Sequence, residues 1–322
     1  MKVLIIKLGY SETLDPEIGT FPSLGDIMRT TVILNCFEYD HVTWLTDKSA
    51  YPLLKDNPLI NRLLFLDMFS VMQLQEERFD VAINLEKVPG MCALANKISA
   101  WSKRGFRLDP EFGEAQAFDG SQEALRVYTN FDVKRKAEKT WQEVLFDMIG
   151  KEWHGEGYIL GYKPQSAPES DVGLNYQIGK KWPSKAWHGW DDLYRVLKEK
   201  GLYVSWQAGQ NNLTDYMEWI NRCDMIVTHD SLGLHLAIAL GKKVVALFGP
   251  TAPQEVYLYG QGVAIRPSNG DFACLPCLKP KCHKQQSCMD TITVETVYGE
   301  IERGLKGEWT GSQHDEAVGY TR

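Results

Sequence analysis

Four cysteines stand close together near the C-terminal end of the chain, with the spacing C-x2-C-x4-C-x5-C. They are Cys274, Cys277, Cys282 and Cys288. Four thiolates in so short a segment can surround one tetrahedral ion, and zinc is the usual occupant. Iron takes the same ligands, so the thiolates do not discriminate between the two metals. Because four sulfurs complete the coordination shell, we expect the metal to be structural, with no position open for a substrate.

A second stretch that could do chemistry runs from His229 to Thr251. Its pattern predicts a strand end, a tight turn, an apolar helix, a glycine stop and another strand. Asp230 or Ser231 can cap the helix by accepting its free amide hydrogens. The same amides, together with the helix dipole, can hold a ligand's diphosphate. The pattern alone leaves open a capped, buried βαβ unit that binds nothing.

The elements that must position these residues alternate between short apolar strands and helices. In the first half, strands are predicted at 2–8, 41–46, 62–66, 81–85 and 103–108, and helices at 25–37, 50–54, 69–75, 89–100 and 134–149. In the second half, strands are predicted at 171–176, 203–207, 225–228 and 243–248, and helices at 190–200, 214–221, 234–240 and 294–305. This alternation indicates parallel sheets with helices on both faces.

The chain has 322 residues, which exceeds the usual size of one hydrophobic core, so two domains are expected. A segment rich in Gly, Pro and Ser at 155–171 is the best linker. We therefore predict an N-terminal domain at 1–165, a C-terminal domain at 166–308 that includes the cysteine segment 274–288, and a flexible polar tail at 309–322. Two such domains form a cleft between the carboxyl ends of their sheets, where ligands bind.

The overall charge excludes some classes of partner. A net charge of -7 gives no basic footprint for nucleic acid and no general attraction to anionic lipid. No run of eighteen apolar residues occurs, so we expect a cytoplasmic protein with at most peripheral contact with the inner membrane. The cysteines outside the cluster are expected to be reduced and buried in the core.

Residues 229–251 resemble the Asp-Ser-Gly-Pro-Met-His-Leu-Ala signature of glycosyltransferase family 9, the bacterial ADP-heptose transferases. Three more segments match in the right order. Residues 24–31 resemble the first loop and helix of that family, 182–187 its Trp-Pro-x-Lys-x-Trp segment, and 274–289 the cysteine tail of many members. The resemblance covers roughly residues 1 to 305.

The resemblance implies a GT-B fold, with two Rossmann-like doubly wound domains facing a cleft, and inverting transfer from an ADP-activated heptose. It places the catalytic carboxylate at Asp26. A carboxylate at a helix start can take the proton of an acceptor hydroxyl as the sugar bond breaks. The alternative for Asp26 is a plain N-cap of that helix.

The family's donor contacts map onto the second half. Catalysis needs cations or amides aimed at the β-phosphate of the leaving ADP, because charge develops there. Lys180 would neutralise this charge without a metal, unless it is merely solvated; His235 would bind phosphate or fill the core, and Asp230 would orient the turn or bind the sugar. The predicted donor-binding residues are Asn175, Tyr176, Lys180, Asp230, Ser231, Leu232, Gly233, Leu234 and His235.

Three departures from the family pattern stand out. Leu232 occupies the place of the usual glycine, and Gly233 follows one position later. The stretch 207–224 is shorter than usual, which leaves the donor's base open. An insertion at 10–23 beside Asp26 is predicted to be a lid or part of the acceptor site.

We therefore predict an enzyme, an inverting glycosyltransferase that moves heptose from ADP-heptose to a hydroxyl of lipopolysaccharide core or of a protein. A nucleotide-sugar epimerase on the same fold and a non-catalytic metal-binding scaffold remain the alternatives. A homo-oligomer is compatible with the sequence.

Overall fold

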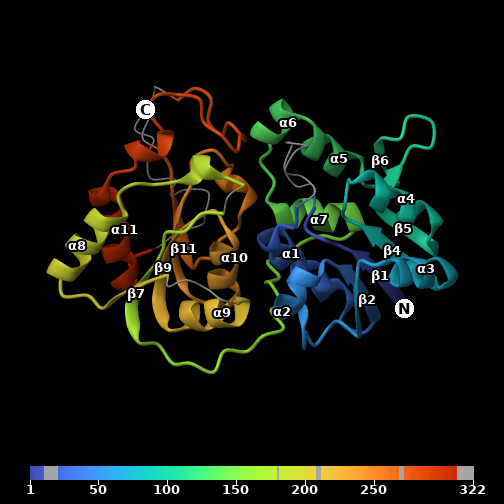
Figure 1. Ribbon diagram of the computed structural model, residues 1–322, viewed down its shortest axis with the longest axis horizontal. Helices are drawn as coiled ribbons and strands as arrows, with labels where there is room; N and C mark the ends of the chain where they lie inside the picture. The colour runs from blue at the N-terminus through green and yellow to red at the C-terminus, as the bar shows by residue number, and fades with distance from the viewer. Residues whose placement is uncertain (11–20, 180, 208–211, 268–271, 310–322) are drawn as a thin grey trace. The chain divides into compact units, whose positions relative to one another are not determined.

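The computed structural model describes residues 1–10, 21–179, 181–207, 212–267 and 272–309. The chain divides into two compact units, residues 1–162 and 163–322, each with its own mainly or fully parallel sheet (Figure 1).

The first unit contains a six-stranded sheet in the order β3-β2-β1-β4-β5-β6. All neighbouring pairs are parallel except the last, in which β6 runs antiparallel to β5. The strands are β1 (Lys2–Ile6), β2 (His41–Thr46), β3 (Arg62–Phe65), β4 (Arg78–Asn84), β5 (Ser99–Leu108) and β6 (Ala115–Ala117). The central strand β1 is buried from its second residue onward, as expected for a parallel strand covered on both faces.

The helices of this unit include one correction to the sequence prediction. They are α1 (Leu24–Thr30), α2 (Tyr51–Leu54), α3 (Met68–Glu76), α4 (Pro89–Lys97), α5 (Gln122–Thr129), α6 (Phe131–Arg135) and α7 (Trp141–Ile149). The helix predicted at 134–149 is wrong, because α6 ends and α7 starts anew. Thr140 accepts a hydrogen bond from the Glu143 amide, and the Glu143 carboxylate accepts one from the Thr140 amide. This capping box forces a helix start.

The second unit contains a five-stranded, fully parallel sheet in the order β11-β10-β9-β7-β8. Its strands are β7 (Ser170–Asn175), β8 (Val204–Trp206), β9 (Cys223–His229), β10 (Lys243–Leu247) and β11 (Gly262–Ile265). Its α-helices are α8 (Trp190–Glu199), α9 (Leu213–Asn221), α10 (Leu232–Ala239) and α11 (Val294–Leu305). Short 3-10 turns include η3 (Pro183–Lys185) and η5 (Cys288–Thr291).

The strand orders show where each unit can bind a ligand. In the first sheet the order reverses between β1 and β4, and in the second between β7 and β9. Ligands of doubly wound sheets bind outside the carboxyl ends of the strands at such a reversal. Ligand-binding residues are therefore expected just after these four strands.

Among the described residues, no helix is both long and apolar enough to span a membrane.

Candidate active site

The turn between β9 and α10 forms the centre of the second unit's site. Ser231 is the N-cap of α10, and its hydroxyl accepts from the Gly233 amide at 3.3 Å. The predicted capping role of Ser231 is confirmed. Gly233, Leu234 and His235 are buried in the first turn of the helix, whereas Leu232 is half-buried.

A nearly buried ion pair holds this turn. The Asp230 carboxylate lies 2.8 Å from the Lys185 ammonium, which also donates to the Asp230 carbonyl at 2.7 Å. The Lys185 side chain is only 12% exposed and the Asp230 side chain only 17%. Burial alone would raise the pKa of the Asp230 carboxyl, but Lys185, helped by His235, holds that pKa well below its usual range. Asp230 is therefore a carboxylate, and Lys185 fixes its direction.

Asn175, at the end of β7, bonds to the same turn. Its amide nitrogen donates to Thr228 Oγ1 at 2.6 Å and to Ser231 Oγ at 3.4 Å. Its amide oxygen accepts from the hydroxyl of Tyr216, on α9, at 2.8 Å. Tyr176, the next residue, is 38% exposed and packs its ring edge-on against Trp206. The structure thus brings the predicted residues Asn175, Asp230 and 231–235 together; Lys180 lies outside the described residues.

His229, the last residue of β9, is a buried imidazole beside the ion pair. Its ring lies edge-on to that of Trp190, with 5.1 Å between the centroids. Burial first, and then the charge of Lys185, lower the pKa of His229 to about 3. The imidazole is therefore neutral at physiological pH.

Asp26 is the third residue of α1, and Ser23 occupies the N-cap position. The plain N-cap alternative for Asp26 is therefore wrong. The Asp26 carboxylate pairs with the guanidinium of Arg29 at 2.9 Å, and that guanidinium lies 4.3 Å over the ring of Trp141. Arg29 thus anchors the carboxylate to α7.

A second buried pair lies at the reversal between β1 and β4. The Lys7 ammonium is 3.7 Å from the Glu86 carboxylate, and both side chains are fully buried. The same carboxylate accepts from the amides of Leu8 and Gly9, at 2.7 and 2.8 Å. Glu86 therefore fixes the chain as it leaves β1. Most of the predicted insertion at 10–23 falls outside the described residues.

The four clustered cysteines lie at different depths. Cys288 is buried, Cys274 and Cys277 are half-buried, and Cys282 is exposed; all are free thiols. Burial is the largest cause that raises the pKa of Cys277 and of Cys288, the latter to about 11, and the neighbouring thiols raise both further. No group of three or more His, Cys, Asp or Glu within the described part of the chain is close enough together to hold a metal ion.

The cysteine segment is bonded to the turns that flank Asp230. Ser184 donates through its amide to the Pro280 carbonyl at 3.1 Å and through its hydroxyl to the Lys279 carbonyl at 2.9 Å. The Leu278 amide donates to the Pro250 carbonyl, just beyond β10, at 2.8 Å. The segment that carries the thiols therefore supports η3, which carries Lys185.

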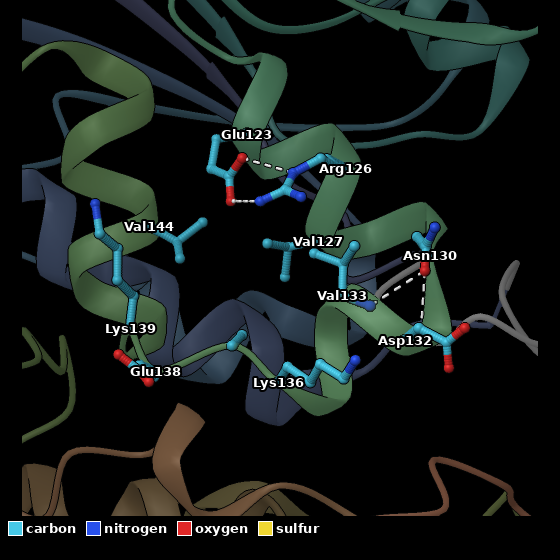
Figure 2. Close-up of a pocket in the computed structure, with 11 residues that line it drawn as sticks. Glu123, Arg126, Val127, Asn130, Asp132, Val133, Lys136, Glu138, Lys139 and Val144 are labelled. Atoms are coloured by element: carbon cyan, nitrogen blue, oxygen red, sulfur yellow. Dashed lines mark hydrogen bonds and ion pairs between the residues drawn. The ribbon is translucent and has the colours of Figure 1, made fainter.

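A separate pocket of about 500 Å³ lies among α5, α6 and α7 of the first unit (Figure 2). Val127, Val133 and Val144 form its apolar part, and the ion pair between Glu123 and Arg126 lies at its edge. None of the residues that line it is a predicted site residue.

Comparisons with known proteins find similarity over part of the chain. Residues 205–287 match the model of Glycosyltransferase family 9 (heptosyltransferase). A curated lipooligosaccharide heptosyltransferase 2 from Campylobacter jejuni subsp. jejuni serotype O:6 is 29% identical over 114 residues, which make up 35% of this chain and 36% of that protein. The chain thus matches only about a third of the length of this relative.

Solved structures match over nearly the whole chain. Escherichia coli ADP-heptose LPS heptosyltransferase II has a TM-score of 0.63 and 17% identity, covering 96% of this chain and 100% of that one. An iron-containing dodecameric glycosyltransferase from enterotoxigenic E. coli has a TM-score of 0.58 and 13% identity, covering 96% and 77%. The predicted α/β fold of the GT-B type is confirmed. The family model, for its part, confirms the resemblance to glycosyltransferase family 9.

Sequence reasoning missed several residues of the site. Lys185 lies within segment 182–187, which resembles the family pattern, but the sequence does not predict that it pairs with Asp230. Tyr216 and Thr228 lie on a regular helix and strand, and no motif distinguishes them from core residues. Glu86 likewise gains its role only from the fold, which places β4 beside β1, whereas Arg29 pairs with Asp26 three residues before it on the same helix.

Removal of the Lys185 ammonium should destabilise the fold. In Lys185→Met, the Asp230 carboxylate stays largely buried without its cation, so the free energy of unfolding should fall by about 3 kcal/mol. Chemical denaturation measures this change. Arg195→Met is the control, because its pair with Asp192 is exposed and should contribute less than about 1 kcal/mol. The double variant with Asp230→Asn should recover most of the loss; no recovery would contradict the assignment.

Acid should destabilise the protein through His229. Its folded-state pKa is about 3 and its ordinary value is 6.5, so between these values the unfolded chain binds the extra proton. This contribution is fully present above about pH 6.5 and is lost as the pH falls. Between pH 7 and pH 5 the loss should be about 2 kcal/mol, measured by urea denaturation. His229→Leu should flatten this dependence, and an unchanged slope would count against it.

Proposed function

We propose that this chain is an inverting glycosyltransferase that transfers a sugar, heptose, from an ADP-activated donor to a hydroxyl group. The acceptor is lipopolysaccharide core or a protein. The observation that carries the proposal is the turn after β9, where a carboxylate, a cation and a capped helix start lie together at a strand-order reversal. The match of residues 205–287 to the family model covers this turn and supports the proposal.

The donor's diphosphate lies at the start of α10. Two features of the turn favour an anion there: the first amides of the helix, and the helix dipole that adds to their field. Asp230, already paired with Lys185, orients the turn or meets the donor sugar. Lys180 adds a cation for the β-phosphate, so that transfer needs no metal at the phosphates.

Asp26 takes the proton of the acceptor hydroxyl. Its pairing with Arg29, which itself lies on Trp141, holds the carboxylate in one direction at the start of α1. The carbon–oxygen bond to ADP breaks as the acceptor oxygen forms its bond to the sugar from the opposite side. The proton passes to Asp26, and the charge left on ADP is met by Lys180 and the amides of α10.

The two other readings of the sequence have less support. An epimerase needs further carboxylates that act on the sugar ring, and both the curated relative from Campylobacter jejuni and the matching structure from Escherichia coli are heptosyltransferases. A scaffold without activity leaves the match of residues 205–287 to a glycosyltransferase family unexplained.

The four cysteines would hold one zinc or iron ion in a structural role. The donor set is soft and complete for a tetrahedral ion, and the thiols interact electrostatically with one another. One neighbour of the same fold is described as iron-containing and dodecameric, which supports both a metal and a homo-oligomer here. We place the protein in the cytoplasm, with any membrane contact peripheral at the inner membrane.

Loss of the proposed base should separate binding from transfer. Asp26→Asn should lower the rate of transfer from ADP-heptose by about two to four orders of magnitude, the usual worth of general-base catalysis. ADP affinity should stay unchanged, because the donor binds in the other unit. Release of ADP measures turnover with lipopolysaccharide core or a candidate protein as acceptor. Asp56→Asn, at an exposed position, is the control; near-normal turnover in Asp26→Asn would remove Asp26 from the mechanism.

The cysteine segment should bind metal in proportion to the chain. Elemental analysis should find about one zinc or iron per chain, and replacement of Cys277 and Cys282 by Ser should abolish it. The thermal midpoint should fall as well, because metal binding is coupled to folding of the segment. Cys36→Ser is the control, since Cys36 lies in the other unit. Native protein that holds no metal, with four freely reactive thiols, would refute the site.

A further inference from the structure

We propose that Tyr216, on α9, is a positioning residue for the donor's diphosphate. Acting through Asn175, it fixes Ser231 so that the Ser231 hydroxyl donates a hydrogen bond to a phosphate oxygen. The inference rests on the proposed function, because it takes the donor to lie at the start of α10.

The direction of each hydrogen bond follows from one carbonyl. The His229 carbonyl can only accept, and the Thr228 hydroxyl lies 2.9 Å from it. Thr228 therefore gives its single proton to that carbonyl. Its oxygen is left to accept from the Asn175 amide nitrogen, 2.6 Å away. The side-chain amide of Asn175 can thus have only one orientation.

This orientation turns the amide oxygen of Asn175 toward Tyr216. The distance to the Tyr216 hydroxyl is 2.8 Å, and the hydroxyl must be the donor. Complete burial raises the pKa of Tyr216 above its usual value, so the phenol keeps its proton. Without this hydroxyl, the Asn175 oxygen would lose its partner and the amide could rotate.

Ser231 is the end of the network and faces the helix start. Its oxygen accepts from the Asn175 amide nitrogen at 3.4 Å and from the Gly233 amide at 3.3 Å. Thr228 Oγ1, also 3.4 Å away, has no proton left to give. In that contact Thr228 Oγ1 can therefore only accept the Ser231 proton, over a long distance, and a charged phosphate oxygen is the stronger acceptor for the same proton. A phosphate oxygen is an acceptor and fits such a donor, whereas a group that only donates does not.

The glycine at 233 is explained by the same contacts. A Cβ atom at this position would lie 2.2 Å from the Asn175 amide nitrogen and 2.3 Å from the Tyr216 hydroxyl. Any side chain would push Asn175 and Tyr216 away from the turn. Gly233, which stands one place later than the glycine of the family pattern, is therefore required by this network.

Calorimetric titration with ADP and with adenosine, which lacks the phosphates, tests the proposal. Tyr216→Phe removes only the hydroxyl and should weaken ADP roughly 3- to 10-fold, as expected for one hydrogen bond, without affecting adenosine. Ser205→Ala is the matched control, because it removes the hydroxyl that accepts from Trp219 on the same helix. It should leave both affinities unchanged. Thr228→Val interrupts the network from its other end and should repeat the pattern of Tyr216→Phe.

A double-mutant cycle separates this role from a merely structural one. In a Ser231→Ala background, Tyr216→Phe should have no further effect on ADP, because the group through which it acts is gone. Equal losses for ADP and adenosine, an undiminished effect in that background, or unchanged ADP affinity in Tyr216→Phe and Thr228→Val would each overturn the inference. If the unaltered chain binds no ADP, the proposed donor is wrong and this inference falls with it.

Discussion

The ion pair between Lys185 and Asp230 connects the parts of the second unit that are far apart in the sequence. Lys185 comes from a short turn, whereas Asp230 follows a central strand, and neither side chain has much access to water. A buried pair of this kind is strongly destabilising when one partner is lost, so each segment depends on the other. The cysteine segment bonds to Ser184, the neighbour of Lys185, and to Pro250 after β10. The cysteine segment, the position of Lys185 and the shape of the turn after β9 are therefore mechanically linked.

In both sheets, polar side chains hydrogen-bond to the chain where the strand order reverses. Where neighbouring strands lead to opposite faces, the backbone at their ends loses its regular partners, and polar side chains take over. In the first unit Glu86 accepts from the amides of Leu8 and Gly9 and pairs with Lys7. In the second, Asn175 bonds to Thr228 and Ser231. Both candidate sites thus include side chains that also stabilise the fold.

The sequence predicted the alternation of strands and helices because buried parallel strands are short apolar runs, such as that of β1. It did not predict the break before Trp141, since residues 134–139 are good helix formers with no Gly or Pro, and only the capping box of Thr140 and Glu143 starts a new helix. For the site, local motifs predicted Asp26 and the turn at Asp230. Partnerships such as that of Tyr216 with Asn175, 41 positions apart, have no local signature. They depend on which strand ends the topology makes neighbours.

The position of the glycine in the turn after β9 is explained by residues far from it in the sequence. Leu232 stands where the family pattern has glycine, and taken alone this suggests an altered turn. The structure requires glycine instead at 233, where the Asn175 amide and the Tyr216 hydroxyl leave no room for a Cβ atom. A buried network of this kind stabilises only when every member is satisfied, because an unpaired polar group in the interior costs about 1–3 kcal/mol. Glycine at 233 is therefore required by Asn175 and Tyr216 together, and a side chain at 233 is expected to need a smaller residue in place of one of them.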